Sequence, residues 1–173
     1  PTALIGKDII ACAATGSGKS LAYLLPLVIN VTHLAITHYP TALILCPTRE
    51  LAIQIEDQLK NLSWGLPLKT ALLIGGVPAP PQLYRIKQGV NVIVATPGRL
   101  AMFIEKSELK LNQIRMVVVD EMDQMLSMGF ENQVLDILQD LPTCQVLLCS
   151  ATISKDTEEI AKIITRDPVY ISV

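Results

Sequence analysis

Seven short apolar runs, separated by longer stretches with helical spacing, set the strongest limit on how this chain can fold. The runs lie at 8–12, 41–46, 69–74, 90–95, 116–119, 145–149 and 169–173, and the helical stretches at 21–36, 49–62, 81–88, 99–105, 130–139 and 155–164. Such alternation is typical of a parallel sheet joined by right-handed crossovers. Several runs are apolar throughout, as expected when helices cover both faces. We therefore predict an α/β domain: a mostly parallel twisted sheet of about seven strands with helices on both faces.

Length and composition indicate one well-buried domain. The chain has 173 residues, half of them apolar and 17% charged, which excludes a disordered chain or a coiled coil. The net charge of −2 gives no overall basic field, so any nucleic-acid site must be a local patch. We read residues 1–173 as a single domain and expect a monomer.

The cysteines and the apolar runs bear on the compartment. Cys12, Cys46, Cys144 and Cys149 lie in or beside expected core strands without metal-ligand spacing, so we interpret them as reduced, buried side chains. No signal peptide is recognisable, and the longest apolar stretch, 21–36, is interrupted by Pro26. These features predict an intracellular protein, in the cytoplasm, the nucleus or both, with no membrane contact.

A glycine-rich loop follows the first apolar run. The segment 13–20 reads AATGSGKS, and a helical stretch comes directly after it. Gly16 and Gly18 allow a tight turn that directs backbone N–H groups toward a polyphosphate, where Lys19 would neutralise charge and Ser20 would ligate Mg²⁺. The first position of the general pattern holds Ala13 instead of glycine. The predicted nucleotide-binding residues are Ala14, Thr15, Gly16, Ser17, Gly18, Lys19 and Ser20.

A second acidic segment lies about a hundred residues later. The run VVVDEMD at 117–123 places Asp120 and Glu121 at the carboxyl end of a buried strand, where ligands of open α/β sheets bind. Alone, such carboxylates often cap the following helix. Together with the glycine-rich loop they predict ATP or GTP chemistry.

Four more polar segments follow strands directly. They lie at 47–50, 75–76, 96–99 and 150–152. Because the carboxyl ends of parallel strands share one edge of a sheet, we expect all four beside the phosphate loop and Asp120.

With these motifs, residues 6–167 resemble the first RecA-like domain of the DEAD-box ATP-dependent RNA helicases. The segment 13–20 is similar to motif I of that family, PTRELAIQ at 47–54 to motif Ia and Gly75-Gly76 to the double-glycine motif. Likewise, 96–99 resembles motif Ib, 120–123 motif II and 150–152 motif III. The segment 75–100 is further similar to the member that carries an N-terminal zinc-finger HIT module. The resemblance implies a RecA-like P-loop NTPase domain.

The resemblance also implies roles for the acidic segment. Asp120 would hold Mg²⁺ through its water shell, together with Ser20, and Glu121 would orient and deprotonate the attacking water. The catalytic residues would then be Glu121, Asp120 and Lys19, acting on ATP. Asp123 would couple the nucleotide state to the RNA face through Ser150 and Thr152.

RNA is the partner that the resemblance implies for the strand-end face. The family holds RNA by phosphates and 2′-hydroxyls, so binding would be independent of base sequence. Arg49 and Arg99 would bond phosphate, and hydroxyl and backbone N–H groups would donate beside them. We expect Gln82 and Arg85 to support the loops of this face. The predicted RNA-binding residues are Pro47, Thr48, Arg49, Gly75, Gly76, Thr96, Pro97, Gly98 and Arg99.

The chain departs from the family pattern at two positions. Met122 replaces the usual alanine of motif II and could alter contacts with motif III or a second domain, and Ser20 replaces threonine. We expect activity to survive both. The adenine-reading Q motif and the second RecA-like domain, with its arginine finger, lie outside the 173 residues. The segment alone is therefore expected to bind nucleotide weakly and to hydrolyse it barely.

Three other functions fit parts of the pattern. An ATP-gated RNA clamp without productive hydrolysis would share every motif, and Met122 leaves room for it. A phosphotransferase such as a nucleoside kinase would also need an acceptor pocket and an arginine-rich lid, which are not recognisable. A DNA helicase is less favoured, because the PTREL and TPGR segments resemble those of RNA helicases.

Overall fold

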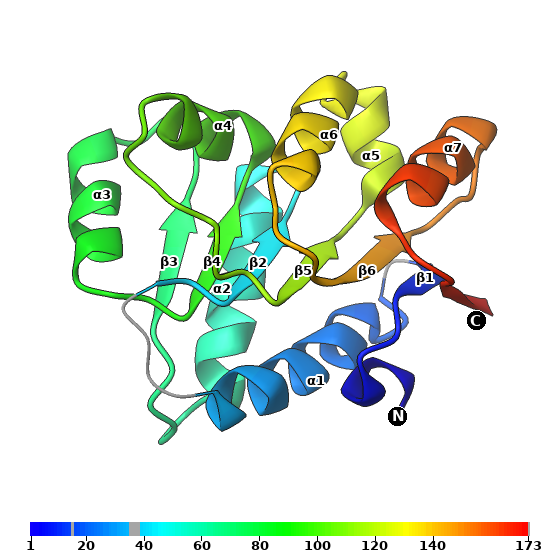
Figure 1. Cartoon of the computed structure of the whole chain (residues 1–173), viewed down its shortest axis with the longest axis horizontal. Helices are drawn as coiled ribbons and strands as arrows, with labels where there is room; N and C mark the ends of the chain where they lie inside the picture. The colour runs from blue at the N-terminus through cyan, green and yellow to red at the C-terminus, as the bar shows by residue number, and fades with distance from the viewer. Residues whose placement is uncertain (15, 35–38, 173) are drawn as a thin grey trace.

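The computed structural model describes residues 1–14, 16–34 and 39–172, and a seven-stranded parallel sheet forms its centre (Figure 1). Its order is β3-β4-β2-β5-β6-β1-β7, and every neighbouring pair is parallel. This confirms the predicted fold class. The strands are β1 (Ile9–Cys12), β2 (Ala42–Leu45), β3 (Thr70–Leu73), β4 (Val92–Ala95), β5 (Met116–Val119), β6 (Gln145–Ser150) and β7 (Val169–Ser172).

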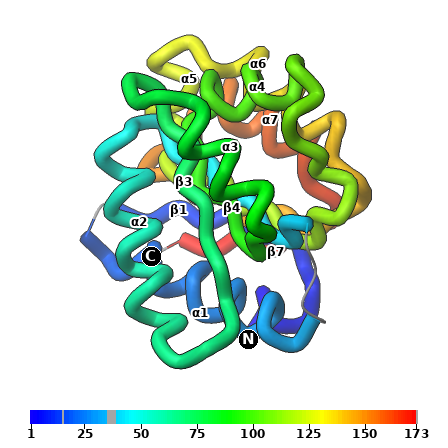
Figure 2. The backbone as a smooth tube through the Cα atoms, turned by 90° about the vertical axis from the view of Figure 1, so that its left-hand side faces the viewer, coloured from blue at the N-terminus to red at the C-terminus, as the bar shows by residue number. Residues whose placement is uncertain are grey.

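Helices cover both faces of the sheet. On one side lie α1 and α2, and on the other α3 to α7, as Figure 2 shows from the β3 edge. The helices are α1 (Lys19–His33), α2 (Arg49–Leu62), α3 (Ala79–Lys87), α4 (Pro97–Glu105), α5 (Met122–Ser127), α6 (Glu131–Gln139) and α7 (Lys155–Ile164), after a short 3₁₀ helix, η1 (Thr2–Ile5). No helix among these described residues is both long and apolar enough to cross a membrane.

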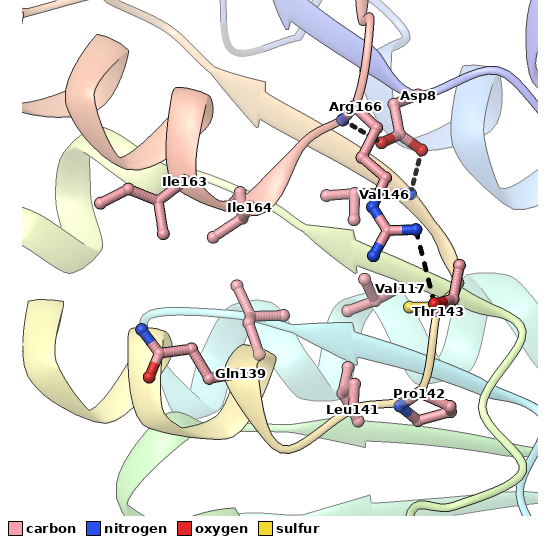
Figure 3. Close-up of a pocket in the computed structure, with 12 residues that line it drawn as sticks. Asp8, Val117, Gln139, Leu141, Pro142, Thr143, Val146, Ile163, Ile164 and Arg166 are labelled. Atoms are coloured by element: carbon pink, nitrogen blue, oxygen red, sulfur yellow. Dashed lines mark hydrogen bonds between the residues drawn. The ribbon is translucent and has the colours of Figure 1, made fainter.

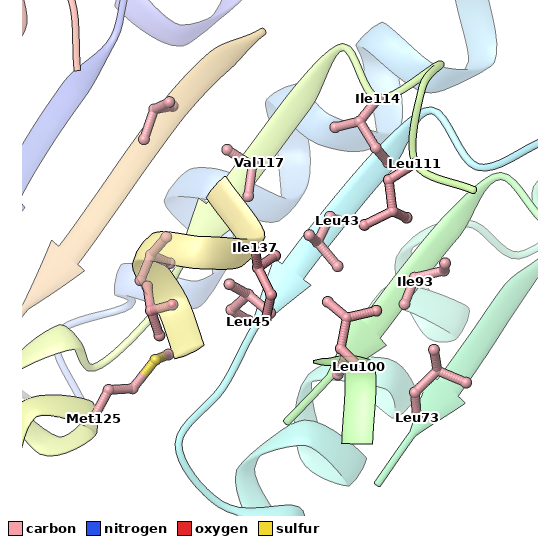
Figure 4. Packing of buried hydrophobic residues seen from close by; sticks show 14 of the residues in the cluster. Leu43, Leu45, Leu73, Ile93, Leu100, Leu111, Ile114, Val117, Met125 and Ile137 are labelled. Atoms are coloured by element: carbon pink, nitrogen blue, oxygen red, sulfur yellow. The ribbon is translucent and has the colours of Figure 1, made fainter. Parts of the chain in front are cut away.

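The strand residues alternate between two apolar cores. In β2, Leu43 and Leu45 face the core beneath α4 to α7, whereas Ala42 and Ile44 face the core beneath α1 and α2. Figure 4 shows the first core, where Ile137 of α6 packs over β2. Both sets are apolar because both faces are covered, so the strands show no polar alternation.

The helix boundaries differ from the prediction in several places. Helix α5 and the 3₁₀ helix η1 were not predicted, because each is too short to show a clear apolar period. Helix α4 begins at Pro97, two residues before the expected start, because proline suits the first turn. Helix α1 begins at Lys19 and ends at His33. The predicted extension of this helix to residue 36 falls partly outside the described residues.

Hydrogen bonds close the amino-terminal edge of the sheet. The Asp8 carboxylate is buried and accepts bonds from the backbone N–H of Val146, at 2.8 Å, and of Arg166, at 2.7 Å (Figure 3). At the start of β3, Glu56 accepts a bond of 2.7 Å from the Thr70 hydroxyl. A cavity of about 220 Å³ opens beside Asp8, between α6 and α7, and it shares no residue with the predicted site.

Candidate functional site

The glycine-rich loop connects β1 to α1 at the carboxyl edge of the sheet. Gly16 and Gly18 have φ of 84° and 86°, a left-handed backbone that glycine adopts without strain. A Cβ on either glycine would have no heavy atom within 4 Å, so the loop presents bare backbone to solvent. The neighbouring Ala14 and Ser17 are exposed, and Thr15 lies outside the described residues. This geometry leaves the loop open to a phosphate chain.

Lys19 and Asp120 meet behind that loop. The Lys19 ammonium lies 3.3 Å from Asp120 Oδ1, and the two side chains are 8% and 2% exposed. The pair is close enough for charge attraction, but no aligned hydrogen bond forms, so the buried ammonium keeps its donors free among the described residues. A buried ammonium whose N–H donors make no hydrogen bond lowers the stability of the fold. The arrangement therefore fits an anionic group that enters from the loop.

Glu121 stands at the mouth of the site in a strained backbone. It has φ of 54° and ψ of 52° and forms the N-cap of α5. A glutamate rarely adopts this left-handed conformation. Its pKa is raised first by burial and then by the charge of Asp120, which outweigh the opposing effect of Lys19. A carboxyl group held in this way is suited to accept a proton.

Asp123 joins the second acidic segment to the end of β6. Its Oδ2 accepts bonds from the Thr152 backbone N–H, at 3.1 Å, and hydroxyl, at 2.9 Å, and its own N–H donates to Ser150 Oγ at 3.2 Å. Burial acts to raise the pKa of Asp123, but these hydrogen bonds outweigh it and lower the pKa. The three residues predicted to act together are therefore in direct contact.

Met122 points into the protein. Its side chain is fully buried and belongs to the core beneath α4 to α7. An effect on contacts with motif III or with a second domain stays a prediction, and it would have to act through packing under α5.

Two of the predicted RNA-binding loops pack against each other. Thr48 caps α2 by accepting a bond from the Leu51 N–H at 3.2 Å. The guanidinium of the next residue, Arg49, lies directly against Gly76, where φ is 75° and any Cβ would collide with it. The exposed Gly76 and half-buried Gly75 thus leave the room that Arg49 occupies. Pro47 is buried under the same turn.

Gln82 closes the double-glycine loop from the helix that follows it. Its side-chain amide bonds both the N–H and the C=O of Ile74, at 3.1 and 3.2 Å, and the C=O of Pro78. This agrees with the support predicted for Gln82. The expectation for Arg85 is wrong, because its Nε donates to the Thr70 carbonyl at the opposite end of β3. The helical direction of α3 carries Arg85 away from the loop.

Arg99 fixes the loop at 96–99. Its Nη2 donates to the Val77 carbonyl at 2.9 Å, and its guanidinium lies over the Phe103 ring. Thr96 and Pro97 are buried, whereas Gly98 is exposed at the start of α4. Both arginines of the predicted RNA face therefore contact the double-glycine segment and its neighbour, which brings these loops into one surface.

Sequence reasoning missed Tyr23. This tyrosine is 2% exposed, and its hydroxyl donates to Asp120 Oδ2 at 2.7 Å. Its position four residues after Lys19, one turn along the same helix face, was a signal that it would lie beside the loop.

The described residues thus bring together a phosphate-type loop, a buried lysine and two strand-end carboxylates. The family model for the DEAD/DEAH box helicases matches residues 1–160. The chain belongs to the DEAD/DEAH box helicase family. No cluster of metal-ligating side chains is found among residues 1–14, 16–34 and 39–172, so Mg²⁺ would depend on water and phosphate as well as on Ser20 and Asp120.

Proteins similar to this chain include relatives from animals and plants. The chain is 54% identical over 173 residues to the human "Probable ATP-dependent RNA helicase DDX59" and 45% identical over 179 residues to the Arabidopsis thaliana "DEAD-box ATP-dependent RNA helicase 41". The matches cover 99% and 100% of the chain but only 28% and 35% of these relatives. The chain thus spans about a third of their length. A solved DEAD box protein from the hyperthermophile Methanococcus jannaschii superposes with a TM-score of 0.93 at 36% identity, covering 99% of this chain and 47% of that one.

Proposed function

We propose that the chain is the ATP-binding half of an RNA-dependent ATPase that unwinds or remodels RNA or RNA–protein complexes. The observation that carries the proposal is the buried Lys19 ammonium, which has a carboxylate neighbour but no hydrogen-bond partner in the described part of the chain, behind a loop of positive-φ glycines. A polyphosphate entering over Gly16 and Gly18 would supply the missing partner. Lys19 would hold its outer phosphates, and the exposed N–H groups of the loop would hold the rest.

The catalytic roles follow from where the carboxylates lie. Mg²⁺, when bound, would neutralise charge that develops on the phosphates. Asp120, fixed on both oxygens, would hold the water shell of the ion with Ser20. Glu121, with its raised pKa, would orient the attacking water and accept its proton.

RNA would bind over the arginine-bearing loops. Arg49 and Arg99 would present guanidinium groups to phosphates, and the exposed backbone of Gly76 and Gly98 allows close approach of a sugar–phosphate chain. No base-reading pocket is needed for such contacts, so we expect affinity that is independent of base sequence and falls steeply with salt. The Asp123–Thr152 contact would link the nucleotide end to this surface.

A second RecA-like domain would complete the enzyme. In phosphoryl transfer an arginine finger contributes roughly 10³ to 10⁵ in rate. We therefore expect the 173 residues alone to hydrolyse ATP barely, and the full-length protein to act as a monomer. The four cysteines are free, and burial raises the pKa of Cys144 to about 11 and of Cys149 to about 12. The absence of disulfides among these four cysteines agrees with the intracellular location that we propose.

The experiment is ATP turnover by the full-length protein, with and without single-stranded RNA. We expect RNA to stimulate turnover and the change Lys19→Ala to abolish nucleotide binding, whereas Lys106→Ala, a change of an exposed lysine, should leave both intact. Retained ATP-dependent RNA binding without any turnover would replace this proposal with the clamp. Nucleotide binding that survives Lys19→Ala would overturn the assignment of the site.

A further inference from the structure

Tyr23 holds the carboxylate on which the proposed metal site depends. It lies on α1 one turn after Lys19, and its ring is part of the core beneath α1 and α2. The hydroxyl reaches out of that core to donate to Asp120 Oδ2 at 2.7 Å, a short bond between buried groups. Packing alone would be served equally by phenylalanine, so the hydroxyl requires its own explanation.

Asp120 is restrained on both oxygens. Oδ1 accepts a bond of 3.0 Å from the Glu121 backbone N–H and lies 3.3 Å from Lys19 Nζ, while Oδ2 accepts only from Tyr23 among the described residues. A phosphate that draws Lys19 away would weaken the first contact. The Tyr23 bond comes from the core side and would remain.

The tyrosine donates to a carboxylate that is expected to hold Mg²⁺. Its hydroxyl is buried and bonds Asp120 Oδ2 at 2.7 Å. Tyr23 and Ser20, the other residue expected to hold the ion, lie three residues apart on α1.

We propose that Tyr23 is a positioning residue, whose hydroxyl keeps the Asp120 carboxylate in the orientation that receives Mg²⁺ with the nucleotide. The inference rests on the proposed ATP function and adds to it a residue that acts through Asp120. Without this bond, Asp120 would lose the restraint on Oδ2 and rotate away from the orientation that receives Mg²⁺.

The test replaces Tyr23 by phenylalanine in the full-length protein, which keeps the ring and removes the hydroxyl. The first readout is binding of a fluorescent ADP at increasing Mg²⁺ concentration, which requires no turnover. Hydrogen bonds to charged groups contribute about 1.5–3 kcal/mol. We therefore expect the half-saturating Mg²⁺ concentration to rise roughly tenfold or more. Binding of ADP without Mg²⁺ should change little, because Lys19 and the loop remain.

The control is Thr70→Val. Thr70 donates a buried bond of the same 2.7 Å length to the Glu56 carboxylate, at the opposite edge of the sheet. If the loss of a buried hydroxyl acted only through stability, Thr70→Val would change the Mg²⁺ dependence as much as Tyr23→Phe. We expect Thr70→Val to lower Tm with unchanged Mg²⁺ dependence.

A second readout separates positioning from general damage. In RNA-stimulated turnover, Tyr23→Phe should raise the Mg²⁺ requirement and lower kcat, with the KM for RNA unchanged. If Tyr23→Phe keeps the Mg²⁺ dependence of the unchanged protein, the role of Tyr23 is overturned and the proposed function is not, whatever the change in Tm. Absence of Mg²⁺-dependent nucleotide binding in the unchanged protein would overturn the proposed function as well.

Discussion

The two edges of the parallel sheet differ in how fully their charged groups are hydrogen-bonded. At the amino-terminal edge, Asp8 accepts two backbone bonds of 2.7–2.8 Å, and Glu56 accepts bonds from Thr70 and Lys60. At the carboxyl edge, Asp120 is bonded on both oxygens, but the Lys19 ammonium beside it has no hydrogen-bond partner among the described residues, and Glu121 has a left-handed backbone and a raised pKa.

The charged groups at the amino-terminal edge stabilise the fold, whereas Lys19 and Glu121 at the carboxyl edge are suited to bind a ligand. A satisfied buried carboxylate contributes to stability, whereas an unpartnered cation or a strained glutamate costs stability and persists when it serves function. Changes at the carboxyl edge should therefore reduce activity more than stability, and changes at the amino-terminal edge should do the reverse.

The largest effect is expected for Glu121→Gln. Loss of the proton acceptor should lower RNA-stimulated turnover of the full-length protein by roughly 10³-fold, within the range that such groups contribute to phosphoryl transfer. A carboxyl group with a raised pKa binds its proton more tightly in the folded state, so its ionisation at neutral pH disfavours folding. Neutral glutamine removes this cost, and Tm should stay level or rise.

Steady-state turnover and thermal unfolding of the same preparation measure the two predicted effects, on activity and on Tm. The exposed Glu108→Gln is the matched control. A large fall in Tm for Glu121→Gln would show that this glutamate is structural and would remove the distinction between the two edges.

Asp8→Ala tests the other edge. It leaves the backbone N–H groups of Val146 and Arg166 without their acceptor, which should cost about 2–4 kcal/mol of unfolding free energy. The neighbouring Asp167→Ala removes an exposed ion pair with Lys7 and places alanine at φ 45°, so it should cost less than Asp8→Ala. Urea unfolding measures the difference. The folded fraction of Asp8→Ala should bind nucleotide normally, and an altered affinity would extend the functional site to this edge.

The fold could be predicted because each strand has its own recognisable sequence pattern. Every strand was located to within two residues at either end, since strands buried on both faces are continuous apolar runs bounded by polar segments. The convergence of the loops after β1, β5 and β6 also followed from topology alone, because parallel strands end at one edge. The contact of Asp123 with Ser150 and Thr152 confirms that convergence.

Side-chain directions could not be predicted in the same way. In the sequence Tyr23 is one of several apolar residues of a helical stretch. The hydrogen bond from its hydroxyl to Asp120 is seen only in the structure. Arg85 and Gln82 lie three residues apart on α3, yet their bonds reach opposite ends of β3. The orientation of Met122 depends on α5, a helix too short to predict. Such details are set by tertiary packing, which local patterns do not encode.

A smaller effect is expected for Gly76→Ala. A Cβ at this position would displace the Arg49 guanidinium, and the left-handed backbone would add about 1–2 kcal/mol of strain. Gly65→Ala is the matched control, since Gly65 has φ of 78° and open space around it. Both variants should lose similar stability, but only Gly76→Ala should weaken RNA binding, by roughly tenfold for one lost phosphate contact. Equal RNA affinities would show that Arg49 does not bind RNA.

The smallest effect concerns the pH dependence of turnover. Burial and the charges of Asp120 and Asp123 raise the pKa of Glu121 above its ordinary value of 4.5, so this group takes up its proton at a higher pH as the solution is acidified. Because the proposed base acts only when ionised, the acidic limb of kcat should lie above pH 4.5. Asp123→Asn removes one negative charge near Glu121, so the acidic limb of the kcat profile should move to lower pH. The variant also loses the carboxylate that bonds Thr152, so kcat should be lower at every pH. A limb that stays in place would mean that burial and Asp120 set the pKa of Glu121, and that Asp123 acts independently of it.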